Sequence, residues 1–285
     1  MTPTIDELTP LEKTLMVTLA GRAADARKKN PLLGDELAVE VLNRLGPSGG
    51  TVKLSETIEI ATAVRSKMLD RLVTTFITDH PDAVVIELGC GLETRMHRIA
   101  PPDSVDWYDV DLPDVIALRR QVIPELDRSH PVAASLTGKH WLDNIPSDRP
   151  VIAVADGVLG FFTEADNRQI LRALTAHFTA GGELALVAYS RITARLMGSL
   201  GVLRSVGIDR SFRGYGFDDP RDLERLDPSL AFVEEQFGAQ APEASRLSWP
   251  VRILAKWFTR WKAQARRGVW VLRYRFPPRR ACTNC

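Results

Sequence analysis

The feature of this sequence that most constrains its fold is an apolar run that ends in a pair of glycines. Val84-Val85-Ile86 is fully apolar and β-branched, and Glu87-Leu88-Gly89-Cys90-Gly91 follows it directly. Such a run is typical of a strand that is buried on both faces of a parallel sheet. Glycine permits left-handed backbone angles and the close approach of a ligand. The segment therefore predicts a buried strand and a tight turn that opens a helix.

Strand and helix patterns alternate after this point. Apolar runs predict strands at 105–110, 151–155 and 184–187, and helical spacing predicts helices at 115–122 and 166–178. Two further strands are predicted at 231–236 and 269–276, the second with the alternation of an antiparallel strand. This order favours an α/β fold with a doubly wound, mostly parallel sheet.

Residues 1–80 contain no clear strand pattern. Apolar residues recur at helical spacing from Leu11 to Ala23, from Leu37 to Leu45 and from Ile58 to Ile77. We therefore predict an N-terminal helical lid at 1–80, a core domain at 81–276 and a tail at 277–285.

Composition favours a soluble, cytoplasmic protein. The chain has 285 residues with 45% hydrophobic residues and a formal net charge of +1. Acidic residues interrupt the N-terminus before any signal-peptide-like run, and no stretch is long and apolar enough to be a transmembrane segment. Three cysteines are too few for a disulfide framework, and the terminal pair Cys282 and Cys285 lacks the partners of a zinc site. No metal is expected, and no nucleic-acid recognition motif is present.

The glycine turn could serve two classes of cofactor. A dinucleotide site needs a third small residue, but Thr94 stands at that position. S-adenosylmethionine needs no phosphate cradle, and an acidic residue before the turn, here Glu87, suits its cationic sulfonium. The pattern favours a methyltransferase over a dehydrogenase.

Two aspartates follow other predicted strands. Asp111 closes the second strand, about 20 residues past the glycine turn, where a carboxylate can accept hydrogen bonds from ribose hydroxyls. The alternative is a helix cap, because Pro113 is a favoured first helical residue. Asp156-Gly157 ends the 151–155 strand and is expected either to line the same cleft or to form a simple turn.

With these residues in view, the sequence resembles the leucine carboxyl methyltransferase superfamily, and within it the tetracenomycin-type polyketide carboxyl O-methyltransferases. The resemblance is carried by residues 84–95, by 107–116 with Asp111-Leu112-Pro113, by Arg119 and by Ala155–Leu159. It also includes Pro31-Leu32-Leu33 with Asp35, and it covers roughly residues 10–235.

The resemblance implies a Rossmann-like class I fold that binds S-adenosyl-L-methionine under the N-terminal lid. It implies that Arg65, in the helix before the first strand, binds the cofactor carboxylate, with Arg22 as a second candidate. Ser135 stands where the family usually has an adenine-binding aspartate, and Asp156 replaces a common glutamate. The predicted cofactor-binding residues are Arg65, Glu87, Gly89, Cys90, Gly91, Asp111, Leu112, Ser135, Leu136, Asp156 and Gly157.

The predicted activity is O-methylation of a small secondary-metabolite or polyketide-type substrate. A carboxylate is ionised at neutral pH and needs no general base, whereas a phenol does. No histidine lies in a catalytic motif, which favours a carboxylate and a mechanism of positioning. Acceptor-side candidates are Tyr189, Arg191, Arg213 and Tyr215. Two alternatives are a carboxyl methyltransferase acting on a peptide or protein, and a non-catalytic cofactor-binding scaffold.

A basic segment near the C-terminus stands apart from these motifs. Eleven Arg and Lys residues lie between Arg246 and Arg280, with no acidic residue after Glu243. We predict a Trp- and Arg-rich helix at 247–267. Either it packs on the sheet with a solvated face, or it docks an acidic peptide, an acidic carrier protein or an anionic membrane surface.

Overall fold

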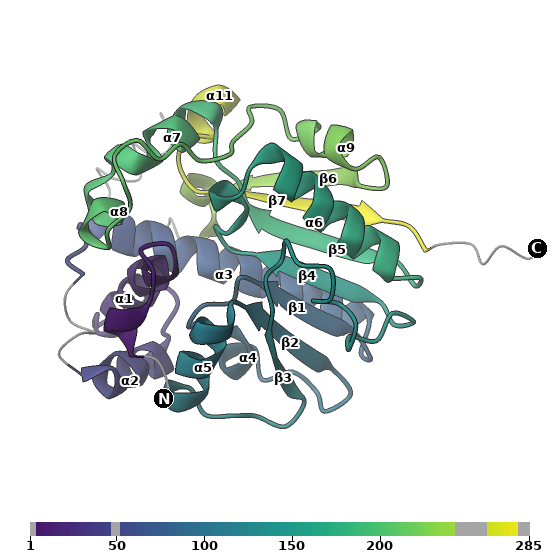
Figure 1. The fold of residues 1–285 in the computed structure, drawn as a ribbon, viewed down its shortest axis with the longest axis horizontal. Coiled ribbons are helices and arrows are strands. Elements are labelled where there is room, and N and C mark those ends of the chain that lie inside the picture. Colours follow the sequence, from purple (N-terminus) through teal and green to yellow (C-terminus); the bar gives the residue numbers. More distant parts are fainter. Residues whose placement is uncertain (1–3, 47–51, 243–260, 279–285) are drawn as a thin grey trace, which may run out of the picture.

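The computed structural model describes residues 4–46, 52–242 and 261–278, and its centre is a seven-stranded sheet (Figure 1). The strand order is β3-β2-β1-β4-β5-β7-β6. The strands are β1 (Val84–Leu88), β2 (Asp106–Asp111), β3 (Ser129–Ala133), β4 (Val151–Ala155), β5 (Gly182–Val187), β6 (Ala231–Phe237) and β7 (Trp270–Phe276).

The directions of the strands confirm the predicted doubly wound, mostly parallel sheet. Strands β1 to β5 pair in parallel, and β7 pairs antiparallel with both β5 and β6. Six of the seven strands coincide with predicted ones. The sequence analysis missed β3, because its residues Ser-His-Pro-Val-Ala are half-buried edge residues and form no apolar run.

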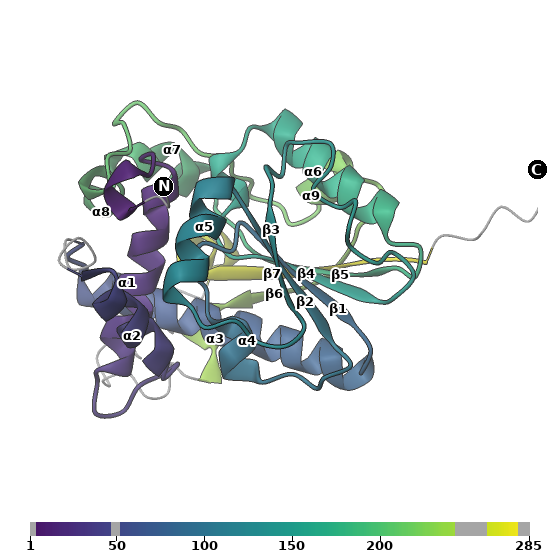
Figure 2. The ribbon, with the colours of Figure 1, turned by 60° about the horizontal axis from the view of Figure 1, so that its bottom comes forward.

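Helices cover both faces of the sheet. In Figure 2, α3 (Glu56–Asp79) and α4 (Arg95–Ile99) lie on one side, and α6 (Glu164–His177) and α9 (Asp222–Leu226) lie on the other. The face of α3 that carries Val64, Met68 and Phe76 is buried against β1, β4 and β5, as its spacing predicted. The side chains of α6, including Ile170, pack on the opposite face.

The remaining helices frame the edge of the sheet at which the parallel strands end. Helices α1 (Leu15–Ala26) and α2 (Glu36–Arg44) pack together and against α5 (Pro113–Val122), whose first residue is the predicted Pro113. Short elements complete the chain: η1 (Ile5–Glu7), η2 (Glu12–Thr14), η4 (Leu159–Phe161), α7 (Arg191–Leu196), η5 (Met197–Ser199), α8 (Gly201–Ser205), η6 (Gly238–Gln240) and α11 (Lys262–Ala265).

Several predictions about the ends of the chain need qualification. The first predicted helix does not begin at Leu11, because a 3-10 turn, η2, precedes α1. Most of the predicted helix 247–267 and the pair Cys282 and Cys285 lie outside the described residues, and only the short α11 is seen. None of the described helices is long and apolar enough to cross a membrane.

Candidate functional site

A cavity of 330 Å³ lies at the carboxyl ends of the five parallel strands. Its lining includes a residue at or just after the end of each of these strands: Gly89 after β1, Asp111 at the end of β2, Ala134 after β3, Asp156 after β4 and Tyr189 two residues after β5. In open α/β sheets ligands bind at this edge. All eleven residues that the sequence assigned to cofactor binding line this cavity.

The glycine turn forms the floor of the cavity. Gly89 and Gly91 have φ angles of +64° and +50°, a conformation that other residues rarely adopt. Space is also limiting, because a Cβ atom on Gly89 would lie 2.5 Å from Val158 Cγ2. Both the backbone angle and the close contact therefore require glycine at position 89.

Asp111 ties the glycine turn to the end of β2. Its Oδ2 accepts a hydrogen bond from the Gly91 backbone N–H at 2.7 Å, and its Oδ1 accepts one from Leu112 N–H at 2.7 Å. The N-cap of α5 is Leu112, with no side-chain cap, so the predicted helix-cap role of Asp111 is not the one observed. Burial raises the pKa of Asp111, and the two N–H donors oppose that rise. A carboxylate with these two bonds retains lone pairs for hydroxyl donors.

Arg65 and Asp156 face each other across the cavity wall. Arg65 Nε lies 3.0 Å from Asp156 Oδ1, and both side chains are mostly buried. Burial acts to lower the pKa of Arg65, but the Asp156 carboxylate raises it above its ordinary value. The Tyr189 hydroxyl approaches the same place. A Cβ atom built on Gly157 would lie 3.0 Å from the Tyr189 hydroxyl and 3.9 Å from Arg65 Nη1, so both groups face Gly157. This part of the cavity offers a cation and a hydroxyl to a ligand.

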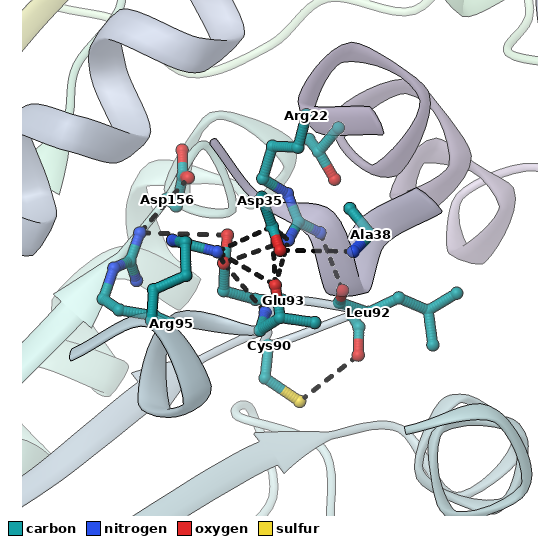
Figure 3. A network of polar contacts seen from close by, with 12 residues as sticks. Arg22, Asp35, Ala38, Cys90, Leu92, Glu93, Arg95 and Asp156 are labelled. Atoms are coloured by element: carbon teal, nitrogen blue, oxygen red, sulfur yellow. Dashed lines mark hydrogen bonds and ion pairs between the residues drawn. The ribbon is translucent and has the colours of Figure 1, made fainter. Parts of the chain in front are cut away.

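Glu87 connects the cavity to a buried network of charges. Its Oε1 accepts a hydrogen bond of 2.5 Å from Arg95, whose Nε donates to Asp70 at 2.7 Å. Burial raises the pKa of Glu87 to about 7, although the Arg95 guanidinium acts to lower it. Figure 3 shows how the network continues from Arg95 through Glu93 toward α1 and α2.

Glu93 is the centre of that network. Its Oε1 lies 2.7 Å from Arg98 Nη1 and 3.1 Å from Arg22 Nη1. Arg22 also contacts Asp35 at 2.6 Å, Thr94 Oγ1 at 2.8 Å and the Leu92 carbonyl at 2.7 Å. Burial acts to raise the pKa of Glu93, but the surrounding guanidiniums hold it well below its ordinary value. The network thus joins α1 and the start of α2 to the Leu92–Thr94 segment that follows the glycine turn.

These contacts change the role predicted for Arg22. Its side chain is fully buried, and it does not line the cavity. Its guanidinium fixes the Leu92–Thr94 segment from behind. Arg119 acts similarly from α5, because its Nη1 donates to the Glu93 carbonyl at 2.5 Å and its Nη2 to Asp109 at 2.7 Å.

Apolar side chains also line the cavity. They come from the chain before and within α1 and from the segments after β4 and β5: Leu11, Leu15, Val17, Val158, Phe161, Phe162 and Leu203. Of the four predicted acceptor-side residues, only Tyr189 lines this space. Arg191 and Tyr215 line a separate surface groove, and Arg213 donates to the carbonyls of Arg210 and Phe212.

The sequence analysis missed this apolar wall. Leu11 and Leu15 had the spacing of a packed helix face, and nothing local distinguished them from core residues. Glu93 lies within residues 84–95, which carry the family resemblance, but the sequence analysis assigned it no role of its own. No histidine lines the cavity in the described part of the chain, and no cluster of potential metal ligands was found there.

The Cys90 thiol is part of the floor of the cavity, and its surroundings do not favour the reactive thiolate form. It is buried, and burial raises its pKa well above the ordinary value. Its Sγ lies 3.7 Å from the Gly91 carbonyl. Cys90 is therefore expected to contribute shape and backbone contacts to a ligand rather than a nucleophile.

Known proteins are similar to this chain in sequence or in fold. The family model of the leucine carboxyl methyltransferases matches residues 15–175. The tetracenomycin polyketide synthesis O-methyltransferase of Streptomyces glaucescens is 35% identical over 94% of this chain and 94% of its own length. An S-adenosyl-L-methionine-dependent methyltransferase of Gibberella zeae is 32% identical, covering 81% and 83%. A crystal structure of a Thermobifida fusca protein assigned as a methyltransferase has a TM-score of 0.56 at 14% identity, covering 91% and 94%, and shows the same class of fold.

Proposed function

The chain belongs to the leucine carboxyl methyltransferase family and is an S-adenosylmethionine-dependent methyltransferase, and from this premise we propose that it methylates an oxygen of a polyketide-type small molecule. The preferred acceptor is a carboxylate, with a phenol as the alternative. The observation that carries the proposal is that the glycine turn, Asp111 and Arg65 meet at one cavity, whose lining also includes apolar side chains. The polar residues suit the cofactor, and the apolar ones suit a mainly apolar acceptor.

The residues that would bind the cofactor each have a proposed task. Arg65 would bind the carboxylate of the cofactor, and Asp111 would accept hydrogen bonds from the ribose hydroxyls. Ser135 and Leu136 would contact the adenine, since they line the cavity after β3, the strand next to the one that ends in Asp111. Gly89, Cys90, Gly91, Leu112 and Gly157 would shape the surface under the nucleoside.

The proposed reaction is an in-line displacement. The bound cofactor supplies an electrophilic methyl group on its sulfonium. The acceptor oxygen forms the new bond to the methyl carbon while the sulfur–carbon bond breaks and its electron pair remains on sulfur. The chain contributes proximity and alignment. No histidine lines the described cavity wall, and a carboxylate acceptor needs no base because it is ionised at neutral pH.

Among the four predicted acceptor-side residues, Tyr189 is the one that lines the cavity. Burial raises the pKa of its hydroxyl, and Arg65 opposes the rise. The hydroxyl is therefore a neutral donor at pH 7, and it would hydrogen-bond an acceptor oxygen rather than remove a proton. The peptide or protein substrate has no specific support here, because the basic helix that suggested it lies mostly outside the described residues.

A product test separates the two acceptors. The enzyme is incubated with methyl-tritiated cofactor and a panel of aromatic carboxylic acids, each paired with its phenol-bearing and carboxamide analogues. A methyl ester releases tritiated methanol in mild hydroxide, whereas an aryl ether does not. Base-labile label on the acids alone would support the carboxylate. Base-stable label would move the assignment to a phenol, and no label on any member would refute the small-molecule proposal.

A further inference from the structure

The buried network beside the cavity is one positive charge short. Its carboxylates are Asp35, Asp70, Glu87, Glu93 and Asp156, and its guanidiniums are Arg22, Arg65, Arg95 and Arg98. Five negative groups therefore face four positive ones within the described residues. An excess buried charge is unfavourable unless a proton or a ligand compensates it.

Geometry identifies the carboxylate that is least compensated. Glu93 lies within 4 Å of three guanidiniums, and Asp35, Asp70 and Asp156 each lie within 4 Å of two. Glu87 contacts Arg95 alone. Glu87 is also only 2% exposed and lines the cavity. Three carboxylates of the network line the cavity, Glu87, Glu93 and Asp156, and Glu87 is the one with the fewest guanidinium partners.

The charges on neighbouring elements act on the pKa of Glu87 in both directions. Asp109 on β2 and Glu93 in the glycine loop both act to raise the pKa of Glu87, while Arg95 on α4 acts to lower it. Arg65 on α3 is engaged with Asp156, which follows β4. The charge of Asp109 is itself offset by Arg119 on α5 at 2.7 Å.

The wall of the cavity also carries the charges of Arg65 and Asp156, whose Nε and Oδ1 atoms lie 3.0 Å apart without the geometry of a hydrogen bond. S-adenosylmethionine fits such a wall, because its carboxylate and ammonium can pair with a guanidinium and a carboxylate and its sulfonium adds one net positive charge. S-adenosylhomocysteine, the product, keeps the first two groups but is neutral overall.

We infer that Glu87 makes this cavity selective for the charge of the sulfonium, by holding a proton when no cation is bound and releasing it when the cofactor binds. This inference rests on the proposal that the cavity is the cofactor site. After methyl transfer the positive charge on sulfur is gone, so the network is again one charge short. Glu87 then regains its proton, and the product is held less tightly than the cofactor.

Calorimetric titration tests the proton directly. Each ligand is titrated into the whole chain at pH 7 in two buffers of different ionisation enthalpy, and the difference in heat gives the protons released. Because the pKa of Glu87 is about 7, binding of S-adenosylmethionine should release about half a proton. Binding of S-adenosylhomocysteine should release markedly less. Equal release with both ligands, or none with either, would overturn the inference.

Variants separate this inference from the site assignment. Glu87→Gln should abolish the proton release and reduce the preference for S-adenosylmethionine over S-adenosylhomocysteine by on the order of tenfold. The matched control is Glu183→Gln, a buried glutamate on β5 that pairs with Arg273 and Arg275 away from the cavity, and it should change neither quantity.

A third variant reports on the cavity itself. Asp111→Ala should weaken both ligands together. If it weakens neither, the cavity is not the cofactor site and the proposed function loses its structural basis. A different result is that Asp111→Ala weakens both ligands while Glu87→Gln prefers S-adenosylmethionine over S-adenosylhomocysteine as strongly as wild type does. The site assignment then stands, and the role of Glu87 is refuted.

Discussion

Replacement of Arg22 by methionine tests whether the buried network holds α1 and α2 to the rest of the fold. Arg22 is fully buried and makes four hydrogen bonds, to Asp35, Glu93, Thr94 and the Leu92 carbonyl. Methionine fills similar volume but leaves two buried carboxylates with one guanidinium fewer. Removal of one partner from a buried ion pair costs about 3–5 kcal/mol. We expect a loss of that size in the free energy of unfolding.

Urea denaturation at pH 7, followed by circular dichroism, measures this loss. The matched control is Arg168→Met, because Arg168 pairs with Glu164 one helical turn away and both side chains are exposed. An exposed pair of this kind contributes about 0.3–0.5 kcal/mol. The reasoning would be refuted if the Arg22 variant lost less than about 1 kcal/mol, or no more than the control.

A double-mutant cycle with Asp35→Asn then locates the energy. Asparagine keeps the cap that Asp35 provides to the Ala38 N–H but removes its charge. If the Arg22–Asp35 contact at 2.6 Å contributes most of this free energy, the double variant should lose clearly less stability than the sum of the losses of the two single variants. Additive losses would instead assign the energy to the Glu93, Thr94 and Leu92 contacts.

Three further outcomes follow from the site. Asp111→Ala should weaken binding of S-adenosylhomocysteine by about 1–3 kcal/mol in calorimetry, and unchanged affinity in a folded variant would remove its ribose role. Gly89→Ala should lower stability and cofactor affinity, because of its φ of +64° and the contact with Val158. Adding Val158→Ala should relieve the steric part only, and full recovery would argue against backbone strain. Glu93 has a lowered pKa in the folded state, so its contribution to stability is present above its unfolded pKa of about 4.3 and is lost as pH falls further. Urea midpoints between pH 6 and 3 should therefore fall less steeply in Glu93→Gln than in wild type, and identical slopes would contradict the assignment.

The strands that are buried on both faces could be predicted from sequence because burial leaves an uninterrupted apolar run. β1 and β4 are fully buried and were found with nearly their observed bounds. β3 is an edge strand with Pro131 in its centre and half-buried side chains, so the same signal was absent. The antiparallel direction of β7 followed from its alternation, which reflects one face against the core and one partly exposed.

Many of the cavity-lining residues could also be predicted, since most of them lie at or near the end of a strand or in the glycine turn. Arg65 depended on the family resemblance, because helical spacing alone does not show that α3 directs it to the strand ends. The acceptor side could not be predicted. Arg191, Arg213 and Tyr215 follow β5 in sequence, yet the chain turns them away from the cavity, and Leu11 and Phe161 take the space instead.

The sequence by itself determined the class of fold and many of the polar residues that line the cavity, because strand burial, glycine turns and acids at strand ends depend on neighbouring residues. Only the tertiary structure decided which charges meet. Arg22 and Glu93 are 71 residues apart, and Arg95 joins Glu87 to Asp70 of another helix. Such pairings depend on how α1, α3 and the glycine loop pack together. The imbalance of buried charge that singles out Glu87 exists only after that packing has brought the groups together.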